Sequence, residues 1–548
     1  MHWRALGVAI LIAGSSISGQ GVEAKERRRP VVVAPLRLIA DDRSTITVAG
    51  LHAYAGDLVL SSASDGLVVV NRLPLETYLL GLNEVPLDWP IEALRAQAIA
   101  ARTYALHTLS QPRGGAAAVY GFDICASVEC QVFSGADVLR LSSDGERWVE
   151  AVTSTTGTAV LYRGDPILAR YYSTSGGRTF DNEQIFPSEG AYPYLKGVTS
   201  ISERRSPLYR WRVIFRLQAA QRILERAGSW TVGRLRSVRT IPSATDAHYP
   251  DLLFEARRKS RRMSTEEFRD IVRELAPDMF PRLYPSPADT SAGRLPETLP
   301  SNRFRAESRG RRMIVRGRGW GHGVGMSQWG AEGMARQGAS SEQILDHYYS
   351  GVEIDEFPDP GPIDVGVAWA RPEVTVSGAF RIVDGENNVI VDAAAGTWHF
   401  RPAGPGAVAI DPPKRHDFPV RVAVVSAPDQ VIPGDKLAIE IALASPASVT
   451  VGLLGDEAGE AEVLGAGRRR LKWRAPRRAG THNVVVTATR GKQVETDRFR
   501  ISVAEAVQTA PDVPPAEMPR PGNGHILVLL GVLGAAVILG ALKVTMRR

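Results

Sequence analysis

The sequence predicts an α+β protein in which a β-rich domain with a few helices precedes an immunoglobulin-like β-sandwich and a C-terminal transmembrane helix. Three patterns support this class: β-type runs broken by turn signals towards both ends of the chain, a long helical segment between them, and an uninterrupted apolar run near the C-terminus. At 548 residues the chain is too long for one ordinary core. A content of 44% hydrophobic and 23% charged residues is typical of a folded protein.

The first predicted domain covers residues 30–358. It begins with alternating strands over residues 36–70, where Gly50, Gly56 and Gly66 mark turns, and continues with a helix over residues 90–109. The other elements expected in this domain are a strand-rich stretch at 148–172, a charged and partly helical segment at 204–312 with helices near 217–227 and 265–275, and two short helices capped by Ser327 and Ser340.

The composition changes after a proline-rich stretch that ends at residue 362. A short β-rich region is expected at 363–412, followed at 415–506 by several β runs at regular spacing, which predict the immunoglobulin-like sandwich. Residues 507–524 form a Pro-rich linker, and residues 525–543 are the predicted transmembrane helix.

Both ends of the chain predict a connection to a membrane. Residues 1–24 have the pattern of a secretory signal peptide, with Arg4 before a short apolar run and small residues after it. The apolar run at 526–542 lies near the lower limit of about 17 residues for a spanning helix. Because Lys543, Arg547 and Arg548 follow it, we expect an exported protein anchored in the cytoplasmic membrane by its C-terminal helix, with its bulk extracytoplasmic.

The net charge of +7 is small for this length. It is compatible with attraction to anionic cell-wall polymers or lipid. No basic module interleaved with aromatic residues is visible, so nucleic acid is not an expected partner. The basic run at 468–474 is either a solvated strand face or a patch for a wall polymer or lipid.

The first segment that carries chemistry runs from Asn71 through N-E-V-P into the helix that follows Pro90. Glu84 lies on a short, stiff loop beside this helix, where burial by a neighbour such as Trp89 would raise the pKa of its carboxyl group. Taken alone, such a glutamate is more often a surface charge. Arg102 lies at the edge of the apolar stripe of the helix, so it either pairs with a structural carboxylate or orients a group at the site.

The second segment, G-R-G-W-G-H-G-V-G-M-S-Q-W-G-A, has a glycine at every second position from 317 to 325. In an extended chain this pattern leaves one face as bare backbone, which another backbone or a ligand can approach closely. His322 is either a buried, hydrogen-bonded side chain or part of a functional site. Trp320 and Trp329 fit sugar stacking and core packing equally well.

Together the two segments resemble the catalytic domain of the stage II sporulation protein D family, which includes amidase-enhancer proteins and acts on bacterial peptidoglycan. The resemblance covers roughly residues 59–353, better than half of the exported portion. It also includes C-Q-V-F-S-G at 130–135, A-R-Y-Y-S-T-S-G-G-R-T at 169–179, P-Y-L at 193–195 and I-L-D-H-Y-Y-S-G at 344–351. The family's E-M-P segment is Glu84-Val85-Pro86 here, a departure that spares the carboxyl group.

The resemblance implies a peptidoglycan lytic transglycosylase that cleaves the bond between N-acetylmuramic acid and N-acetylglucosamine and leaves an anhydro-muramyl product. Glu84 would be its single catalytic residue, acting first as acid and then as base. The residues expected to bind substrate around it are Gln97, Arg102, Tyr104, Ser173, Ser175 and His322.

Cys125 and Cys130 are the only cysteines of the chain. In an exported protein they suggest a disulfide that closes a small loop. Some members of the family instead hold zinc here with a histidine ahead of two cysteines, which this chain lacks, so zinc would need Asp123 or His107. We expect the disulfide and no cofactor, with zinc as the alternative.

Two other classes of function stay open. The chain is either an enzyme, a non-catalytic glycan-binding enhancer of a cell-wall amidase, or chiefly a structural tether whose sandwich domain binds a partner. The expected partners are peptidoglycan glycan strands, a cell-wall amidase in the second case, and the membrane through the C-terminal helix.

Overall fold

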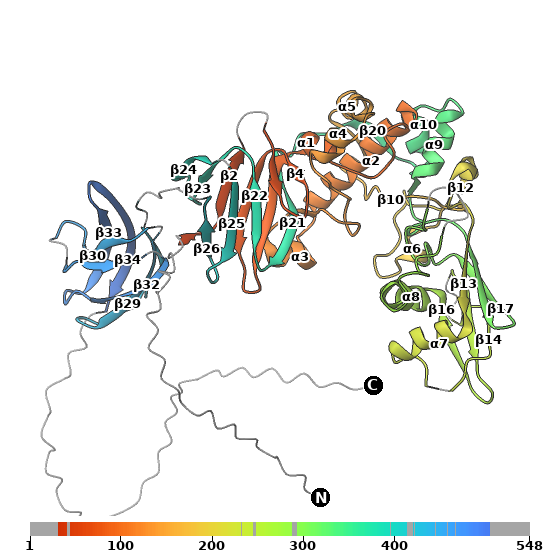
Figure 1. Ribbon diagram of the computed structural model, residues 1–548. Coiled ribbons are helices and arrows are strands. Elements are labelled where there is room, and N and C mark those ends of the chain that lie inside the picture. The colour runs from red at the N-terminus through yellow and green to blue at the C-terminus, as the bar shows by residue number, and fades with distance from the viewer. Residues whose placement is uncertain are drawn as a thin grey trace, which may run out of the picture.

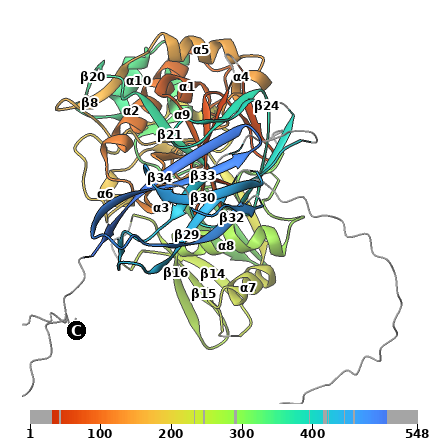
Figure 2. The same cartoon turned by 90° about the vertical axis from the view of Figure 1, so that its left-hand side faces the viewer.

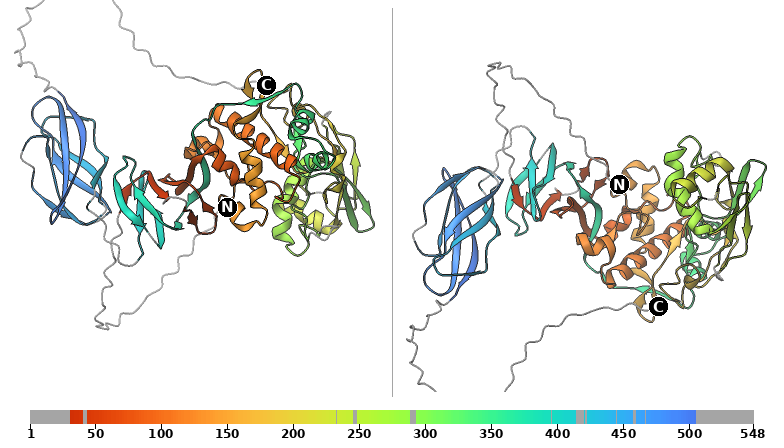
Figure 3. Two further views of the ribbon diagram at one scale, coloured as in Figure 1. Left: turned by 90° about the horizontal axis from the view of Figure 1, so that it is seen from above. Right: turned by 90° about the horizontal axis from the view of Figure 1, so that it is seen from below.

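The computed structural model describes residues 31–504, apart from 41–43, 232, 245–247, 288–292, 395, 414–419, 421, 444, 457–458 and 466. Three parts lie in a row, with a β-sandwich at one end, two large sheets in the middle and a separate sheet with two helices at the other end (Figure 1). Views from above and below show the same order (Figure 3). The predicted signal peptide, linker and transmembrane helix lie outside the described residues.

The middle part is built on two sheets to which the two ends of residues 31–411 both contribute. One has the order β1-β26-β25-β22-β3-β4 and the other the order β24-β23-β2-β5-β6-β21-β7. Their strands are β1 (Val31–Val33), β2 (Leu36–Ala40), β3 (Ile46–Val48), β4 (Ala53–Tyr54), β5 (Asp57–Ser62), β6 (Leu67–Pro74), β7 (Ile124–Cys125), β21 (Pro362–Arg371), β22 (Val374–Ser377), β23 (Phe380–Val383), β24 (Val389–Ala394), β25 (Thr397–Pro402) and β26 (Ala407–Asp411).

This pairing differs from the predicted division of the chain. Residues 363–412 are not a separate region, because β21 pairs along β6 and β23 pairs with β2. Their apolar side chains share one core with those of residues 32–161. The composition change after residue 362 therefore marks the return of the chain to the first sheets and not a domain boundary.

Helices cover one end of the middle part, and α2 is the central one. The helices here are α1 (Leu75–Leu80), α2 (Ile91–Ser110), α3 (Gly115–Tyr120), α4 (Asp137–Leu141), α5 (Gly145–Thr153), α6 (Asn182–Ile185), α9 (Gln328–Arg336) and α10 (Ser341–Tyr348), with a 3-10 turn at Ser202–Arg205. The predicted stripe of α2 packs on the main core through Leu94 and Ala98, while Ala96 and Ile99 pack on a second core. Alanine on both sides lets these layers approach α2 closely.

Short strands join these helices to one another. They are β8 (Thr158–Tyr162), β9 (Asp165–Pro166), β10 (Tyr171–Tyr172), β11 (Gly177–Arg178), β12 (Thr199–Ser200), β19 (Met326–Ser327) and β20 (Glu353–Glu356). Trp148 lies in helix α5 and not in the strand predicted there, because Trp148, Ala151 and Val152 follow helical spacing and are buried. Ser327 and Ser340 cap α9 and α10 as predicted.

Residues 211–317 form a sheet with its own hydrophobic core. Its strand order is β13-β18-β17-β14-β15-β16, and two helices lie with it. The elements are β13 (Trp211–Arg216), α7 (Leu217–Arg226), β14 (Ser237–Ile241), β15 (Asp251–Glu255), β16 (Ser260–Ser264), α8 (Thr265–Met279), β17 (Phe304–Arg309) and β18 (Arg312–Gly317). Both helices were predicted, but the sheet was not.

The last described part is a sandwich of two sheets, β27-β29-β32 and β28-β34-β33-β30-β31. It stands in front of the rest of the molecule in Figure 2. Its strands are β27 (Val422–Ser426), β28 (Gln430–Val431), β29 (Lys436–Leu443), β30 (Ala447–Leu453), β31 (Glu462–Leu464), β32 (Gly467–Arg474), β33 (Gly480–Arg490) and β34 (Gln493–Val503). Of the basic run, Arg468, Arg470 and Lys472 lie on β32 opposite β29.

The fold class predicted from the sequence is wrong in one respect. The described residues are β-rich with ten α-helices, and none of these helices is long and apolar enough to cross a membrane. The longest, α2, carries Glu92, Arg95 and Arg102 and is buried in protein. The described residues therefore do not support the predicted C-terminal transmembrane helix, and residues 525–543 themselves lie outside the part that the structure describes.

Candidate active site

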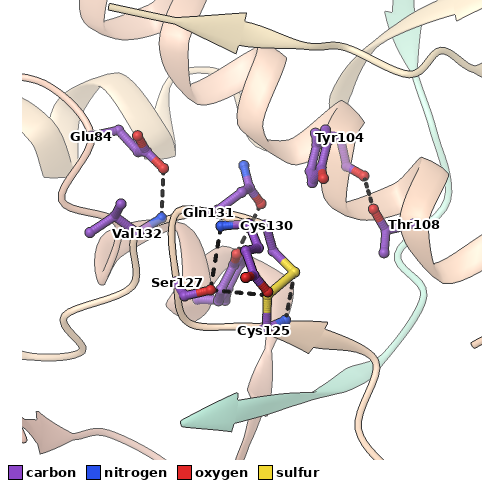
Figure 4. Close-up of a disulfide and its surroundings, with 10 residues drawn as sticks. Glu84, Tyr104, Thr108, Cys125, Ser127, Cys130, Gln131 and Val132 are labelled. Carbon is purple, nitrogen blue, oxygen red and sulfur yellow. Dashed lines mark hydrogen bonds between the residues drawn. A yellow bond between two sulfur atoms is a disulfide. The ribbon is translucent and has the colours of Figure 1, made fainter. Parts of the chain in front are cut away.

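Glu84 lies in the connection between α1 and α2, and this connection is fixed by backbone pairing with the C-Q-V-F-S-G segment. The Asn83 N–H donates to the Val132 carbonyl (2.8 Å), and the Ser134 N–H donates to the Gly81 carbonyl (2.8 Å). The Val132 N–H donates to Oε1 of Glu84 at 2.6 Å (Figure 4). Two motifs far apart in the sequence thus hold the carboxyl group in one orientation.

A chain of hydrogen bonds links Tyr78, Gln131 and Tyr171 beside Glu84. The Tyr78 hydroxyl donates to Oε1 of Gln131 (2.9 Å), and Nε2 of Gln131 donates to the Tyr171 hydroxyl (2.8 Å). Gln131 also donates to the Ala101 carbonyl at 3.2 Å, which fixes it to helix α2. Because the Tyr171 oxygen accepts from Gln131, its own proton is free to face Glu84.

The carboxyl group of Glu84 is half-buried and has a raised pKa. Burial raises this pKa, while the Val132 N–H and the side chains of Tyr171 and Gln328 oppose the shift by stabilising the charged form. Within the described part of the chain, no second carboxylate is among the groups that shift it. The arrangement therefore favours a single carboxyl group that keeps its proton to higher pH than usual.

The glycine segment places Gln328 next to Glu84 and Trp329 next to Trp89. Strand β19 pairs in parallel with β10, with Met326 opposite Tyr171, and Trp320 pairs with Thr174. The Trp329 ring meets the Trp89 ring edge-on at 5.1 Å between centroids.

The glycines allow another backbone segment to approach closely, as predicted. The glycine segment itself is not extended, contrary to the prediction. Gly319 and Gly325 have φ of +76° and +75°, in the left-handed region. An added Cβ would lie 2.5 Å from the Thr174 carbonyl oxygen at Gly319 and 2.1 Å from the Arg170 carbonyl oxygen at Gly325. The segment that approaches the bare backbone is thus residues 170–180 of the same chain.

The His322 side chain is hydrogen-bonded to the backbone of Tyr171. Its Nε2 donates to the Tyr171 carbonyl (3.0 Å), and its Nδ1 accepts from the Val324 N–H (3.2 Å). Burial, together with the nearby positive charge of Arg170, lowers the pKa of His322 to about 4. The ring is therefore neutral at physiological pH, with both nitrogens occupied, and it positions Tyr171.

This geometry predicts a stability that depends on pH through His322. The folded pKa of about 4 lies below the ordinary value of 6.5, so the contribution is complete above pH 6.5 and is lost as the pH falls towards 4. The full difference is about 3 kcal/mol. Denaturant unfolding at pH 7, 6, 5 and 4 should show a smaller acid loss for His322→Gln than for wild type. Parallel curves for the two proteins would contradict this assignment.

Two other predicted residues lie close to Glu84. Gln97 is buried and accepts from Nε2 of Gln328 at 3.4 Å, while its own Nε2 has no partner among the described residues. Tyr104 is near enough for the charge of Glu84 to raise the pKa of its hydroxyl, after burial as the larger cause. Ser173 contributes its carbonyl, which accepts from the Trp329 N–H at 3.0 Å.

Arg102 is not a site residue, contrary to the prediction that it binds substrate. It is fully buried, and its Nε and Nη2 donate to the two carboxylate oxygens of Glu76 at 2.7 Å each. Its other donors reach Thr155 and the carbonyls of Val152 and Thr158. All five N–H groups are thus occupied in the packing of α1, α2 and α5, because a buried guanidinium must be satisfied where it lies.

Arg102→Met is expected to lower the unfolding free energy by about 3 kcal/mol, since it leaves Glu76 and two carbonyls without their partner. Arg95→Met is the matched control on the same helix. Arg95 pairs with Glu92 and Glu150 near the surface, so its loss should cost less than about 1 kcal/mol. Urea unfolding measures both, and equal losses would contradict the structural role of Arg102.

Ser175 is also committed to the structure. Its N–H (2.9 Å) and hydroxyl (2.7 Å) donate to the carboxylate of Glu203, which is fully buried. Gly177 N–H and the hydroxyls of Ser200 and Ser327 complete the shell. This carboxylate thereby fastens the S-T-S-G-G segment to the start of α9.

The sequence pattern missed four residues of this site. Gln131, Tyr171 and Gln328 lie inside motifs that were recognised, next to Cys130, two before Ser173 and directly after Ser327. Their positions inside recognised motifs could have identified them as candidate site residues. Glu203 had none, because it lies in a charged stretch that is typical of an exposed surface.

Cys125 and Cys130 are joined by a disulfide (Figure 4) with 5.5 Å between their Cα atoms. The two residues that zinc would need have other partners here, since Asp123 pairs with Arg113 and Nδ1 of His107 contacts the Pro166 carbonyl. Among the residues described, no group of three or more His, Cys, Asp or Glu side chains could hold a metal ion.

Thiol titration of the unfolded, unreduced protein is therefore expected to find no free thiol, while reduction should release two. Metal analysis of protein purified without chelator is the companion measurement. Two free thiols together with stoichiometric zinc would contradict the disulfide.

The chain is similar to known proteins over this region. The family model described as Stage II sporulation protein matches residues 63–162, which include Glu84. Stage II sporulation protein D of Bacillus amyloliquefaciens is 31% identical over 302 residues, covering 52% of this chain and 76% of that protein. The protein of the same name from Bacillus subtilis (strain 168) is 31% identical over 297 residues, with the same coverage. The Amidase enhancer of Bacillus subtilis (strain 168) is 26% identical over 300 residues, covering 50% of this chain and 39% of that protein.

Proposed function

Because the chain belongs to the stage II sporulation protein D family, we propose that it is a lytic transglycosylase of peptidoglycan with Glu84 as its single catalytic residue. The observation that carries the proposal is the half-buried carboxyl group with a raised pKa at the meeting point of four motifs. Ordinary glycosidases need two carboxyl groups, separated by about 5 to 9.5 Å. A single one suits a reaction in which the substrate supplies its own nucleophile.

The reaction proceeds by two proton transfers at one group. Protonated Glu84 donates its proton to the glycosidic oxygen as the bond to C1 of the muramyl sugar breaks. The resulting carboxylate accepts the proton of the sugar's own C6 hydroxyl, whose oxygen forms the new bond to C1. The products are an anhydro-muramyl end and a free hydroxyl on the departing sugar, and Glu84 is protonated again without water.

The surroundings of Glu84 stabilise both protonation states that the reaction needs. Burial favours the acid form that begins the reaction. The Val132 N–H and the Tyr171 and Gln328 side chains stabilise the carboxylate that forms next. The hydrogen-bonded chain through Gln131 keeps Tyr171 in place for this role.

An extracytoplasmic location follows from the same proposal, since its substrate is the cell wall. The disulfide supports it, because such bonds persist in oxidising compartments.

The similarity to a protein named Amidase enhancer favours a second candidate. In this reading the chain binds glycan without cleaving it and stimulates a separate amidase. The raised pKa of Glu84 favours the enzyme, because a carboxyl group that only binds glycan needs no shifted protonation.

The test is to incubate the purified full chain with peptidoglycan, both intact and stripped of stem peptides by an amidase, and to analyse the products by mass spectrometry. Anhydro-muramyl ends are the expected result, and the better substrate shows whether stem peptides must be removed first. Binding without cleavage of either substrate would overturn the enzyme and support the enhancer.

A further inference from the structure

One face of the sheet formed by residues 211–317 carries a regular array of arginines. The opposite face packs into the core through Val213, Phe215 and Val315. Because side chains alternate across a strand, the residues between these point the other way. On β13, β18 and β17 those positions are mostly arginine.

The arginines form two rows of three, one set by the strand register and one just beyond the strand ends. Arg316 on β18 is directly opposite Arg212 on β13 and Arg305 on β17. Arg210, Arg318 and Arg303 lie two positions further along the chain, just beyond the ends of these strands, where the Arg318 N–H donates to the Arg303 carbonyl (3.0 Å). Neighbouring strands lie about 4.8 Å apart, and alternate residues of a strand about 6.7 Å. We call these six residues the arginine array.

Few carboxylates balance this charge. Glu307 pairs with Arg316 (2.6 Å) and with Arg309 (3.0 Å). Within the described residues, no carboxylate pairs with Arg210, Arg212 or Arg305. Like charges directly opposite one another destabilise a sheet. This face of the sheet therefore carries more positive than negative charge.

The array lies in a hollow and not on a flat surface. A cavity of about 1260 Å³ is lined by all six arginines together with Arg239, His248 and Tyr249. The pKa of Arg303 is lowered by burial and by the charge of Arg318, so the positive charges are close enough to repel one another. A concave lining favours a chain-like ligand over the plane of a lipid headgroup layer.

We propose that the arginine array binds a linear phosphodiester polymer of the cell envelope. The planar guanidinium group matches phosphate with two parallel hydrogen bonds. Rows of charge this closely spaced suit a polymer with one anion in every short repeat. A glycan strand carries at most one carboxylate on each muramyl sugar and matches the array less well.

The array is coupled to the candidate active site without being part of it. Arg318 belongs to the glycine segment, and Nη1 of Arg303 donates to the Ser175 carbonyl at 2.8 Å. A polymer held here would keep the protein on the wall beside its substrate. The proposal is independent of the chemistry at Glu84, since a non-catalytic protein would use the same surface.

The test measures binding of fluorescent poly(glycerol phosphate) to the full chain over a series of salt concentrations. The triple variant Arg210→Gln/Arg212→Gln/Arg305→Gln is expected to bind at least about tenfold more weakly, with the salt slope reduced by about one for each arginine removed. The matched control is Arg257→Gln/Arg258→Gln/Lys259→Gln, which removes the same charge from an exposed turn of the same sheet. It should bind within about twofold of wild type.

Equal weakening in the two triple variants would overturn the proposal, because it would reduce the effect to net charge. Polyglutamate of equal charge, peptide-stripped glycan and phosphatidylglycerol vesicles are the competing ligands. Tighter binding of any of these than of poly(glycerol phosphate) would also overturn it. Circular dichroism and thermal unfolding check that both variants fold.

Discussion

Replacing Glu84 with glutamine is expected to lower the rate of peptidoglycan cleavage by at least about 100-fold, because the amide neither donates nor accepts the transferred proton. Glutamine keeps the shape of the side chain, and its oxygen can still accept from the Val132 N–H. The release of anhydro-muramyl products, measured by mass spectrometry, should fall while binding of the glycan stays within a few-fold of wild type.

Glu129→Gln is the matched control for this substitution. Glu129 is exposed within the loop closed by the disulfide, so its change of charge is equal but lies outside the site. Its rate should equal that of wild type. If Glu84→Gln releases anhydro-muropeptides as fast as wild type, Glu84 is not the catalytic acid.

The same mechanism fixes the direction of the pH profile. The acid form of Glu84 begins the reaction, so the rate constant should fall as the pH rises through its raised pKa. Tyr171→Phe removes a group that stabilises the charged form, and it should move this fall to higher pH.

The second large effect is expected from Gly325→Ala. The added methyl group would lie 2.1 Å from the Arg170 carbonyl oxygen, so the backbone of residues 170–172 must move. The φ of +75° adds strain for any residue other than glycine. We expect a loss of about 3 kcal/mol or more in unfolding free energy, measured by urea denaturation, together with loss of activity as Tyr171 moves.

Gly338→Ala is the control that separates the steric clash from the strain of a positive φ. Gly338 also has a positive φ, +92°, but nothing lies within 4 Å of an added Cβ. It should therefore show only the conformational cost, about 1 kcal/mol. Equal losses at both positions would mean that the close approach at Gly325 contributes nothing.

The sequence predicted the position of Glu84 and the extent of the long helix because both depend on local pattern. It could not predict the partners of Glu84, since Val132, Tyr171 and Gln328 come from segments that meet only in the folded chain. Arg102 shows the same limit. Its place on the helix indicated a buried charge, but only the structure shows that Glu76 is its partner.

The sheet of residues 211–317 was missed for a different reason. Its strands alternate arginine with apolar residues, as in W-R-V-I-F-R over Trp211–Arg216. Its high charge density led to the interpretation as a charged, partly helical segment. The alternation was present in the sequence, but it was not recognised as a strand pattern because its polar positions are mostly arginine.

The pairing of β21 with β6 sets an order of events in biosynthesis. Strand β6 and the short β7 both depend on β21, which is made more than 230 residues after Cys125. Until then the edge of β6 that faces β21 has no neighbour, and the Asp123 and Ala126 N–H groups lack their acceptors, the carbonyls of Asp364 and Gly366. Such long-range closure slows folding. A fragment that ends at residue 358 lacks β21 and exposes this edge, which favours aggregation, so we expect an independently folding piece to extend at least to the end of β26 at Asp411.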